Sequence, residues 1–231
     1  MDGSHLTEAE RRELLKHRKS DYPMPPGALG CFLSHRAAWT RIVSCKDKWA
    51  FVVEDDAHLS SHSEVLFAGT NWIPENADIV KAETSREMTE VSASAIPARN
   101  QYKLRRLKAA HRNTAGYFVN RSTAERLLEL TSQRCDPIDE LLFNPKLGVS
   151  TALTVYQLDP AISVQDKDAP MPMGFEQTII RDQDPVPRVL MPFGPAKIAR
   201  ELTRIHRRKI RPKLLQWLQI SQFKTIPFDG D

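Results

Sequence analysis

WAFVVEDD, residues 49–56, joins an apolar run of strand length to three consecutive acidic residues. A buried strand that ends in carboxylates brings them to the carboxyl edge of a sheet, where open α/β sheets bind their ligands. Adjacent like charges repel one another, and a divalent cation relieves that repulsion. Carboxylate oxygens suit Mg²⁺ or Mn²⁺, which proteins commonly share with substrate phosphates. The run therefore predicts a metal–diphosphate site, although on these residues alone a solvated acidic turn is an equal alternative.

A second segment, upstream of the acidic run, decides between these interpretations. Residues 27–39 read GALGCFLSHRAAW. Together with AFVVEDD, this segment resembles the G-x-x-G-C-x-x-S-H…W and L-E-D-D signatures of glycosyltransferase family 25, which includes bacterial enzymes that add galactose or glucose to lipooligosaccharide. Further segments that resemble the family, in the same order, are AGYFV at 115–119, AERLL at 124–128 and DPIDELL at 136–142.

The resemblance implies both a fold and a reaction. The expected fold is α/β, a GT-A-like (Rossmann-like) sheet that carries an acidic metal motif. The expected reaction is an inverting transfer of a hexose, galactose from UDP-galactose, onto a lipid-linked lipopolysaccharide or lipooligosaccharide core acceptor. Mn²⁺ or Mg²⁺ is expected to bridge the acidic motif and the diphosphate of the UDP-sugar.

The motif residues receive separate roles at this predicted site. If the chain stays extended, Glu54 and Asp56 point to the same side, so these two are the expected metal ligands. Glycines at a helix start let a phosphate approach the free backbone N–H groups there. The residues expected to contact the donor are Gly27, Gly30, Ser34, His35, Glu54 and Asp55. For Ser34 and His35, a buried polar pair that fixes the loop is an equal alternative.

Asp139 is the predicted general base, which would take the proton from the acceptor hydroxyl as that oxygen attacks the anomeric carbon. The choice follows the P-x-D pattern of the family; Asp136 and Glu140 compete for the role, and an acid that favours a helix dipole is the alternative. Cys31 and Trp39 are expected to be core residues rather than chemical groups. Polar residues late in the chain that are expected within reach of the site are Asp159, Gln165 and Asp166, the last as a further metal ligand.

Local patterns predict alternating strands and helices, as in an α/β sheet. A capping box at Thr7–Glu10 predicts a helix to about Lys19. Further predicted helices are 30–45, 122–130 and 137–143; predicted strands are 49–53, 78–82, 115–119 and 149–156, with an edge hairpin at 102–107. Residues 84–100 are polar and are expected to form an irregular loop.

The start of the chain departs from the family pattern. Members usually open with a strand and helix reading I-x-V-I-N-L-x-R-R-x-D-R, which precede an A-V-D-G-x-x-L-T stretch. This sequence opens with MDGSHLT, inside the latter stretch. We therefore expect an N-terminally truncated domain that lacks the first β-α unit and part of the donor pocket. Our hypothesis is a gene start assigned too late, because Met1 falls where relatives carry valine.

The charge of the chain is concentrated near its end. Residues 197–213 hold eight Lys or Arg and one acid, a net charge of +7, which leaves −3 for the rest because the whole chain carries +4. We predict a transferase domain over 1–195 and a basic amphipathic appendage over 196–231. Residues 197–218 are expected to bind an anionic membrane surface, which predicts a cytoplasmic protein peripheral at the inner membrane. Nucleic-acid binding is not expected, since aromatic residues are not interleaved there.

Composition fits an ordinary globular protein, with 41% hydrophobic and 27% charged residues among 231. No apolar stretch reaches the length of a membrane-spanning helix, and the first residues have no apolar signal region. Three cysteines without C-x-x-C spacing predict reduced thiols. The alternative function is an inactive, truncated family member that acts as a membrane-associated binding protein.

Overall fold

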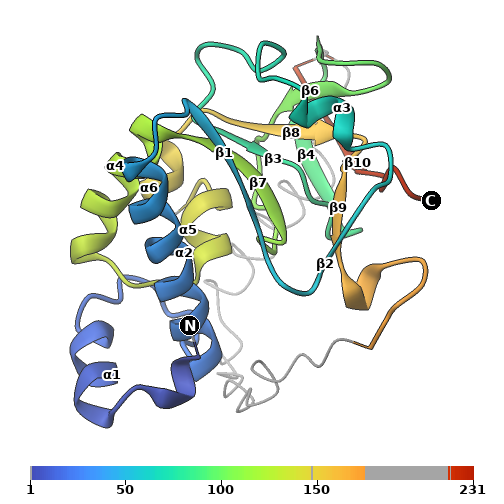
Figure 1. Cartoon of the computed structure of the whole chain (residues 1–231). Helices are drawn as coiled ribbons and strands as arrows, with labels where there is room; N and C mark the ends of the chain where they lie inside the picture. Colours follow the sequence, from blue (N-terminus) through green and yellow to red (C-terminus); the bar gives the residue numbers. More distant parts are fainter. Residues whose placement is uncertain (1, 147, 175–217, 219) are drawn as a thin grey trace, which may run out of the picture.

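The protein is represented by a computed structural model that describes residues 2–146, 148–174, 218 and 220–231. A six-stranded mixed sheet lies at its centre (Figure 1), in the order β1-β7-β3-β8-β6-β5. The strands are β1 (Trp49–Val53), β3 (Ile79–Lys81), β5 (Ile96–Pro97), β6 (Lys103–Arg106), β7 (Gly116–Asn120) and β8 (Val155–Asp159). β3 and β8 run parallel, and the other neighbours run antiparallel. The predicted α/β class is confirmed in this coarse form; the GT-A assignment stays a prediction.

Most helices gather on one side of this sheet (Figure 1). The helices are α1 (Glu8–Leu15), α2 (Pro26–Ser44), α3 (Glu64–Phe67), α4 (Arg121–Leu130), α5 (Ile138–Phe143) and α6 (Gly148–Thr151), with 3₁₀ turns η1 (Gly3–His5), η2 (Thr131–Gln133) and η3 (Asp166–Asp168). α2 packs against α4 and α5, and α3 lies on the other side of the sheet. Proline at the first position of α2 is favourable, because that residue needs no backbone N–H donor.

The two faces of the sheet bury separate apolar clusters, as alternation along a strand requires. Tyr117 and Val119 of β7 face the helical side, where they join Trp39 of α2 in one cluster. Phe118, between them in sequence, faces the opposite side and packs against Trp72. Trp39 is completely buried, which confirms its predicted place in the core.

Two short antiparallel ribbons complete the domain. β2 (Ala57–Leu59) pairs with β9 (Ser163–Gln165), and β4 (Met88–Ser92) pairs with β10 (Ser221–Thr225). The prediction of an irregular loop over 84–100 was therefore wrong. Thr89–Ser92 are buried because a strand about 130 residues further along the chain pairs with them, a partner that no local pattern reveals.

Other local predictions had mixed outcomes. The strand at 49–53 and the capping box of α1 are confirmed, although α1 ends at Leu15. The strand predicted over 149–156 was wrong at its start, because residues 148–151 form α6 and β8 begins at Val155. The cap of α4 is Asn120, whose side chain accepts a hydrogen bond from the N–H of Thr123.

The ends of the chain bear on the predicted domain division. The boundary at 195 and nearly all of the basic segment 197–218 lie outside the described residues. The end of the predicted appendage belongs to the folded domain: Ile226 and Phe228 are buried, and Arg86 forms a bidentate ion pair with Asp231. Among the described residues, β1 pairs with β7 alone, and the predicted loss of a first β-α unit stays a prediction. Within the same residues, no helix is long and apolar enough to cross a bilayer.

Candidate active site

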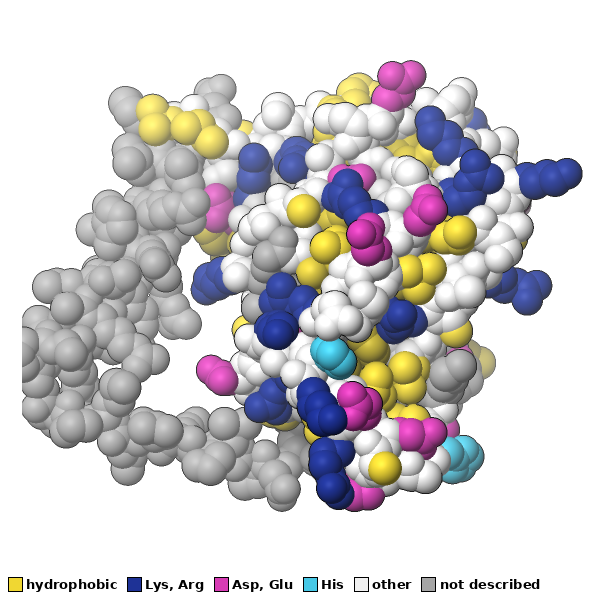
Figure 2. Space-filling view, turned by 90° about the vertical axis from the view of Figure 1, so that its left-hand side faces the viewer, with side chains coloured by type: hydrophobic (Ala, Val, Ile, Leu, Met, Phe, Trp, Pro, Cys, Tyr) yellow, Lys and Arg dark blue, Asp and Glu magenta, His cyan; other side chains and the backbone are white. Residues whose placement is uncertain are grey.

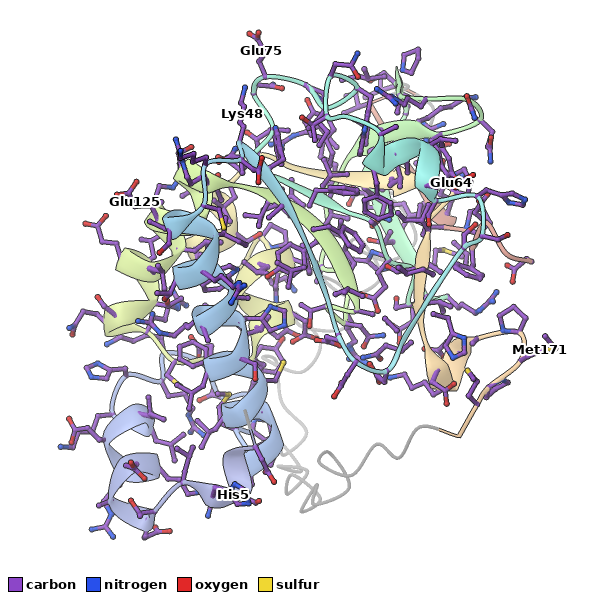
Figure 3. All side chains as sticks on the ribbon, in the orientation of Figure 1. His5, Lys48, Glu64, Glu75, Glu125 and Met171 are labelled. Carbon is purple, nitrogen blue, oxygen red and sulfur yellow. The ribbon has the colours of Figure 1, made fainter. Side chains whose placement is uncertain are left out.

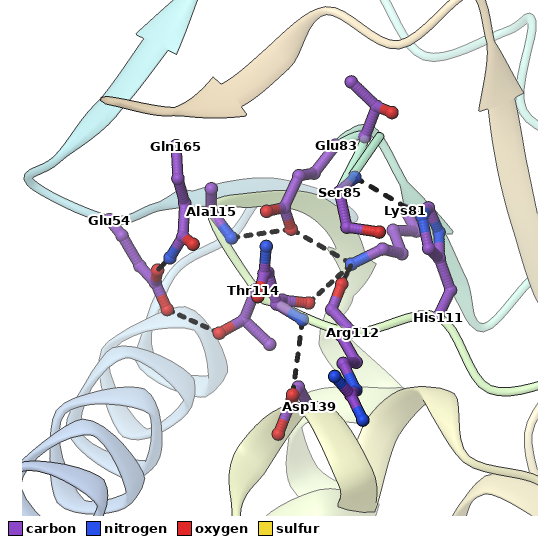
Figure 4. A network of polar contacts seen from close by, with 12 residues as sticks. Glu54, Lys81, Glu83, Ser85, His111, Arg112, Thr114, Ala115, Asp139 and Gln165 are labelled. Carbon is purple, nitrogen blue, oxygen red and sulfur yellow. Dashed lines mark hydrogen bonds and ion pairs between the residues drawn. The ribbon is translucent and has the colours of Figure 1, made fainter. Parts of the chain in front are cut away.

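The acidic run lies where the ends of three strands meet at one edge of the sheet. β1 and β3 run in the same direction on either side of β7, which runs against them. The residues after β1 and β3 therefore lie beside the residues that precede β7. Glu54, Glu83 and Thr114 come together in this way, in the polar network of Figure 4.

The acidic run does not stay extended. The N–H of Ala57 donates to the carbonyl of Glu54 at 3.3 Å, which closes a turn with Asp55 and Asp56 at its centre. Asp55 is exposed and Asp56 is half-buried. Burial, followed by the charges of Glu54 and Asp55, raises the pKa of Asp56 above its usual value. A divalent cation would relieve this repulsion, so the turn fits the ion predicted from the sequence.

Glu54 points away from this turn, toward α2. Its Oε1 atom accepts a hydrogen bond from Thr114 Oγ1 and lies 3.4 Å from His35 Nε2 and 3.8 Å from Cys31 Sγ. Its Oε2 atom accepts a hydrogen bond from Gln165 Nε2 at 3.1 Å. Burial alone would raise the pKa of Glu54, but hydrogen bonds from His35 and Thr114 lower it to about 2. Glu54 is therefore an ionised, well-anchored carboxylate, and Gln165 reaches the site as predicted.

His35 connects Glu54 to the core. Trp39 Nε1 donates to the hydroxyl of Tyr117 at 2.9 Å, and that hydroxyl lies 2.8 Å from His35 Nδ1. Because an indole N–H can only donate, the Tyr117 hydroxyl is free to give its own proton to Nδ1, and Nε2 then donates to Glu54. The imidazole is 4% exposed and stacks on the Tyr117 ring. This geometry makes His35 a fixed partner of Glu54; its predicted contact with the donor stays a prediction.

The other predicted donor residues lie in the first half of α2. Gly27 and Gly30 are buried, and Ser34 is half-buried. η1 packs against this part of α2, and a Cβ atom on Gly3 would overlap the backbone of Pro26 and Gly30. The close approach of η1 gives this turn of α2 a packing role, and the donor-binding roles of Gly27, Gly30 and Ser34 stay predictions.

A buried ion pair lies beside the acidic turn, and the sequence analysis missed it. The side chains of Lys81 and Glu83 are both completely buried, with 3.0 Å between Nζ and Oε2 (Figure 4). Lys81 Nζ also donates to the carbonyls of Arg112 and Asn113, and Glu83 Oε2 accepts from the N–H of Ala115 at 2.8 Å. The pair therefore fixes the segment 112–115. The sequence signal was available: a lysine inside the apolar strand DIVKA, two residues before a glutamate.

The same segment reaches the predicted base. The N–H of Asn113 donates to Asp139 Oδ2 at 3.3 Å, and Thr114, the next residue, donates to Glu54. Asp139 is half-buried at the start of α5. Asp139 and Glu54 are therefore held by two consecutive residues, Asn113 and Thr114.

The two acids that compete with Asp139 for the role of base, Asp136 and Glu140, form hydrogen bonds outside the site. Asp136 is completely buried and accepts hydrogen bonds from the N–H and hydroxyl of Ser20 and from Arg134. Burial raises the pKa of Asp136, but these hydrogen bonds outweigh that effect and the net pKa is lowered. Glu140 accepts a hydrogen bond from the side chain of Asn144. Asp139 is therefore the acid of α5 that is tied to the site.

The late acidic residues do not meet the acidic run through their side chains. Asp159 forms ion pairs with Arg105 and Lys224, so its predicted reach to the site was wrong. Asp166 is 3% exposed and accepts hydrogen bonds from His58 and from two N–H groups of the loop that carries Met171. Met171 itself projects outward from that loop (Figure 3). Asp166 contacts Asp56 only through the backbone: the N–H of Asp166 donates to the carbonyl of Asp56 at 2.9 Å.

A histidine behind the ion pair is held neutral. Burial, followed by the charge of Lys81, lowers the pKa of His111 to about 3. His111 Nδ1 lies 2.9 Å from Gln157 Oε1, and Nε2 accepts a hydrogen bond from the N–H of Ser85. A neutral ring that donates through Nδ1 satisfies both contacts.

Comparison with known proteins identifies relatives of this chain. The profile described as glycosyltransferase family 25 (LPS biosynthesis protein) matches residues 2–142. The lipooligosaccharide biosynthesis protein lex-1 of Haemophilus influenzae is 30% identical over 153 residues, 62% of this chain and 50% of that protein. The lacto-N-neotetraose biosynthesis glycosyltransferase LgtB of Neisseria meningitidis serogroup A is 29% identical over 146 residues, 59% of this chain and 52% of that protein.

The chain spans about half the length of these curated relatives. The matched region contains the acidic run, the α2 motif and Asp139, the three features that the geometry brings together. Because the profile covers more than half of the sequence, the match shows to which family the chain belongs. The chain belongs to glycosyltransferase family 25.

Proposed function

We propose that this protein is an inverting hexosyltransferase that moves galactose from UDP-galactose onto a lipopolysaccharide or lipooligosaccharide core acceptor. Family membership and the names of its relatives support the general reaction, and the resemblance of the motifs suggested the donor. The observation that carries the proposal is the joint placement of two carboxylates. Consecutive residues, Asn113 and Thr114, contact Asp139 and Glu54.

The acidic turn is the proposed place for the donor diphosphate and Mn²⁺ or Mg²⁺. Of the predicted ligand pair, Asp56 keeps this role, with Asp55 beside it, while Glu54 faces α2 and anchors the start of the turn. Bound there, the cation would neutralise charge on the leaving diphosphate. The pKa of Asp56 is raised by burial and then by the negative charges of Glu54 and Asp55, and a cation bound beside these charges would relieve their repulsion, which supports this assignment.

Asp139 is the proposed base for the acceptor hydroxyl. Its carboxylate is fixed through Oδ2 by the N–H of Asn113 and through Oδ1 by the N–H of Glu140 at 2.8 Å. Each oxygen of a carboxylate has two lone pairs, so both retain accepting capacity for a substrate hydroxyl. An in-line attack opposite the leaving group inverts the anomeric carbon.

Substitutions at these acids separate donor binding from chemistry. Asp56→Ala should abolish Mn²⁺-dependent UDP binding measured by calorimetry. Asp139→Asn should retain that binding but lower turnover by about 10²–10⁴-fold, the range typical for loss of a general base. Glu140→Gln is the matched control, because the carboxylate of Glu140, next to Asp139 in the sequence, contacts Asn144 instead of the segment 113–114. Transfer by Asp139→Asn at the parent rate, or a product with the anomeric configuration of the donor, would refute the assignment.

A second candidate function is donor or acceptor binding without catalysis. Calorimetry and transfer assays distinguish the two. UDP-galactose binding without any transfer to a core acceptor would support this binding role over the enzyme.

We also propose that the basic segment 197–218 holds the protein at an anionic membrane surface. The support is its sequence alone, with a net charge of +7 over 197–213 and apolar residues at helical spacing. On the helical face of the described domain, Lys and Arg lie interspersed with acidic residues (Figure 2), so this surface offers no comparable run of one sign. Deleting 197–218 should abolish salt-sensitive sedimentation with anionic vesicles; unchanged binding would contradict the role.

A further inference from the structure

Three potential metal ligands converge behind the acidic turn. Cys31 Sγ, His35 Nε2 and Glu54 Oε1 all lie within 4.8 Å of one another. Among the described residues, the carboxylates of Glu54, Asp55 and Asp56 form no such group. The two sequence segments that carry the family resemblance therefore meet at a mixed sulfur, nitrogen and oxygen site, and the three acids do not meet at one point.

Helix geometry places the first two ligands on the same face. Cys31 and His35 are four residues apart on α2, so their side chains lie one above the other. Glu54 approaches this face from the end of β1. His35 is 4% exposed, the Glu54 side chain is 19% exposed and Cys31 is half-buried, so bulk water reaches the group only in part.

The spacing of the ligand atoms suits a tetrahedral ion. With metal–ligand lengths of about 2.0 to 2.3 Å, sulfur, nitrogen and oxygen atoms around tetrahedral zinc lie roughly 3.3 to 3.6 Å apart. Glu54 Oε1 lies 3.4 Å from His35 Nε2 and 3.8 Å from Cys31 Sγ. An adjustment of a few tenths of an ångström at Cys31 would bring its contact with Glu54 into range, and Cys31 Sγ lies within 4.8 Å of His35 Nε2.

Outer contacts of the kind that orient metal ligands are also in place. His35 Nδ1, on the far side of the ring, lies 2.8 Å from the hydroxyl of Tyr117. Glu54 Oε2 accepts a hydrogen bond from Gln165, and Thr114 donates to Oε1. Such partners fix the tautomer and the direction of the ligands, and their loss typically costs about 10–100-fold in metal affinity.

We propose that Cys31, His35 and Glu54 bind one transition-metal ion of the Zn²⁺ or Co²⁺ class, with a fourth coordination position left open. Thiolate and imidazole select such ions over Mg²⁺, which prefers oxygen ligands. Binding releases the thiol proton of Cys31 to solvent, and the ion compensates the thiolate charge. The proton that His35 carries on Nε2 in the metal-free protein moves to Nδ1, which then donates to the hydroxyl oxygen of Tyr117. Three protein ligands with an open position are typical of a site that also takes water or substrate. This site is separate from the Mn²⁺ or Mg²⁺ proposed at Asp55 and Asp56, and it does not depend on transferase activity.

Cobalt spectroscopy on the purified full chain tests the site directly. Titration with Co²⁺ alone should produce a near-ultraviolet thiolate-to-cobalt charge-transfer band and visible bands of tetrahedral cobalt, saturating at one ion per chain. One equivalent of Zn²⁺ should remove them. Cys31→Ser should lose the charge-transfer band, whereas Cys45→Ser, which changes an exposed thiol, and Asp56→Asn should keep it.

The outer contacts provide an independent measurement if Cys31→Ser fails to fold. Tyr117→Phe keeps the ring stack and removes the hydroxyl that contacts His35 and also accepts a hydrogen bond from Trp39 Nε1. It should weaken Co²⁺ binding by about 10–100-fold while retaining the band at saturation. The proposal is overturned if the parent chain shows no charge-transfer band, if Cys31→Ser keeps it, or if Tyr117→Phe binds Co²⁺ with the parent affinity.

Discussion

Replacing Lys81 with methionine would leave the buried carboxylate of Glu83 without its cation. Both side chains are fully buried, and the ammonium group also donates to the carbonyls of Arg112 and Asn113 and lies 4.1 Å from the centre of the Phe143 ring. Removing one partner of a buried ion pair costs about 3–5 kcal/mol, because the other charge stays desolvated. We expect the free energy of unfolding of Lys81→Met to fall by this amount.

Urea unfolding of four proteins isolates the pairwise contribution. Glu83→Gln keeps an oxygen for the N–H of Ala115 but carries no charge, so the double variant with Lys81→Met has no stranded carboxylate. We expect the double variant to be more stable than Lys81→Met, with a coupling energy of about 0.5–3 kcal/mol. A Lys81→Met protein within about 0.5 kcal/mol of the parent, at unchanged m value, would refute the reasoning.

The pH dependence of this deficit has a definite sign. Burial raises the pKa of Glu83, which Lys81 opposes, and loss of Lys81 raises it further. A carboxyl whose folded pKa lies above its unfolded value is favourable when protonated, and that contribution is lost as pH rises through the folded pKa. With Lys81 present, the pKa of Glu83 is already about 7, so between pH 4.5 and 7 both proteins lose stability alike. The deficit of Lys81→Met should therefore grow as pH rises above about 7, where the carboxylate ionises in the folded parent before it ionises in the folded variant. A deficit that does not grow between pH 7 and about 9 would contradict a stranded carboxylate.

Three further predictions concern stability and are measured by urea unfolding. Gly116→Ala should cost about 1–3 kcal/mol, because its Cβ would overlap the side chain of Ser163, and Ser163→Ala in the same chain should recover part of this loss. Glu54, with its pKa lowered from 4.5 to about 2, should contribute about 3 kcal/mol that is lost as pH falls from 4.5 toward 2; Glu54→Gln should be flatter over this range. Phe228→Ala should cost about 3–5 kcal/mol if the C-terminal residues are an integral part of the core, and a loss below 1 kcal/mol would contradict that role.

Elements with strong local signals could be predicted from the sequence. The bounds of β1 were predicted correctly, because an apolar run of strand length that ends at a charged turn indicates a strand. The edge of the sheet that carries the acidic run was also predictable, since strand direction decides it. β4 was not, because its polar residues are buried only by pairing with β10, far along the chain.

Some residues of the candidate site could be brought together from the sequence, but their orientation could not. Glu54, His35 and Asp139 do converge, as the order of motifs suggested. The expected pairing of Glu54 with Asp56 assumed an extended chain, and the hydrogen bond that closes the turn at Ala57 removes that alternation. The lysine inside DIVKA was visible in the sequence, but its partners were not, because the carbonyls of Arg112 and Asn113 reach Lys81 only in the fold.

The segment 112–114 has the geometry required to couple these groups. Asn113 has a φ of 67°, in the left-handed region that asparagine tolerates better than most residues. This bend lets its N–H face Asp139 and its carbonyl face Lys81, while the next side chain turns to Glu54. A disturbance at Lys81 should therefore reach the base and the acidic turn together. Turnover and UDP affinity should both fall in a Lys81→Met protein that remains folded, whereas Asp139→Asn should change turnover alone.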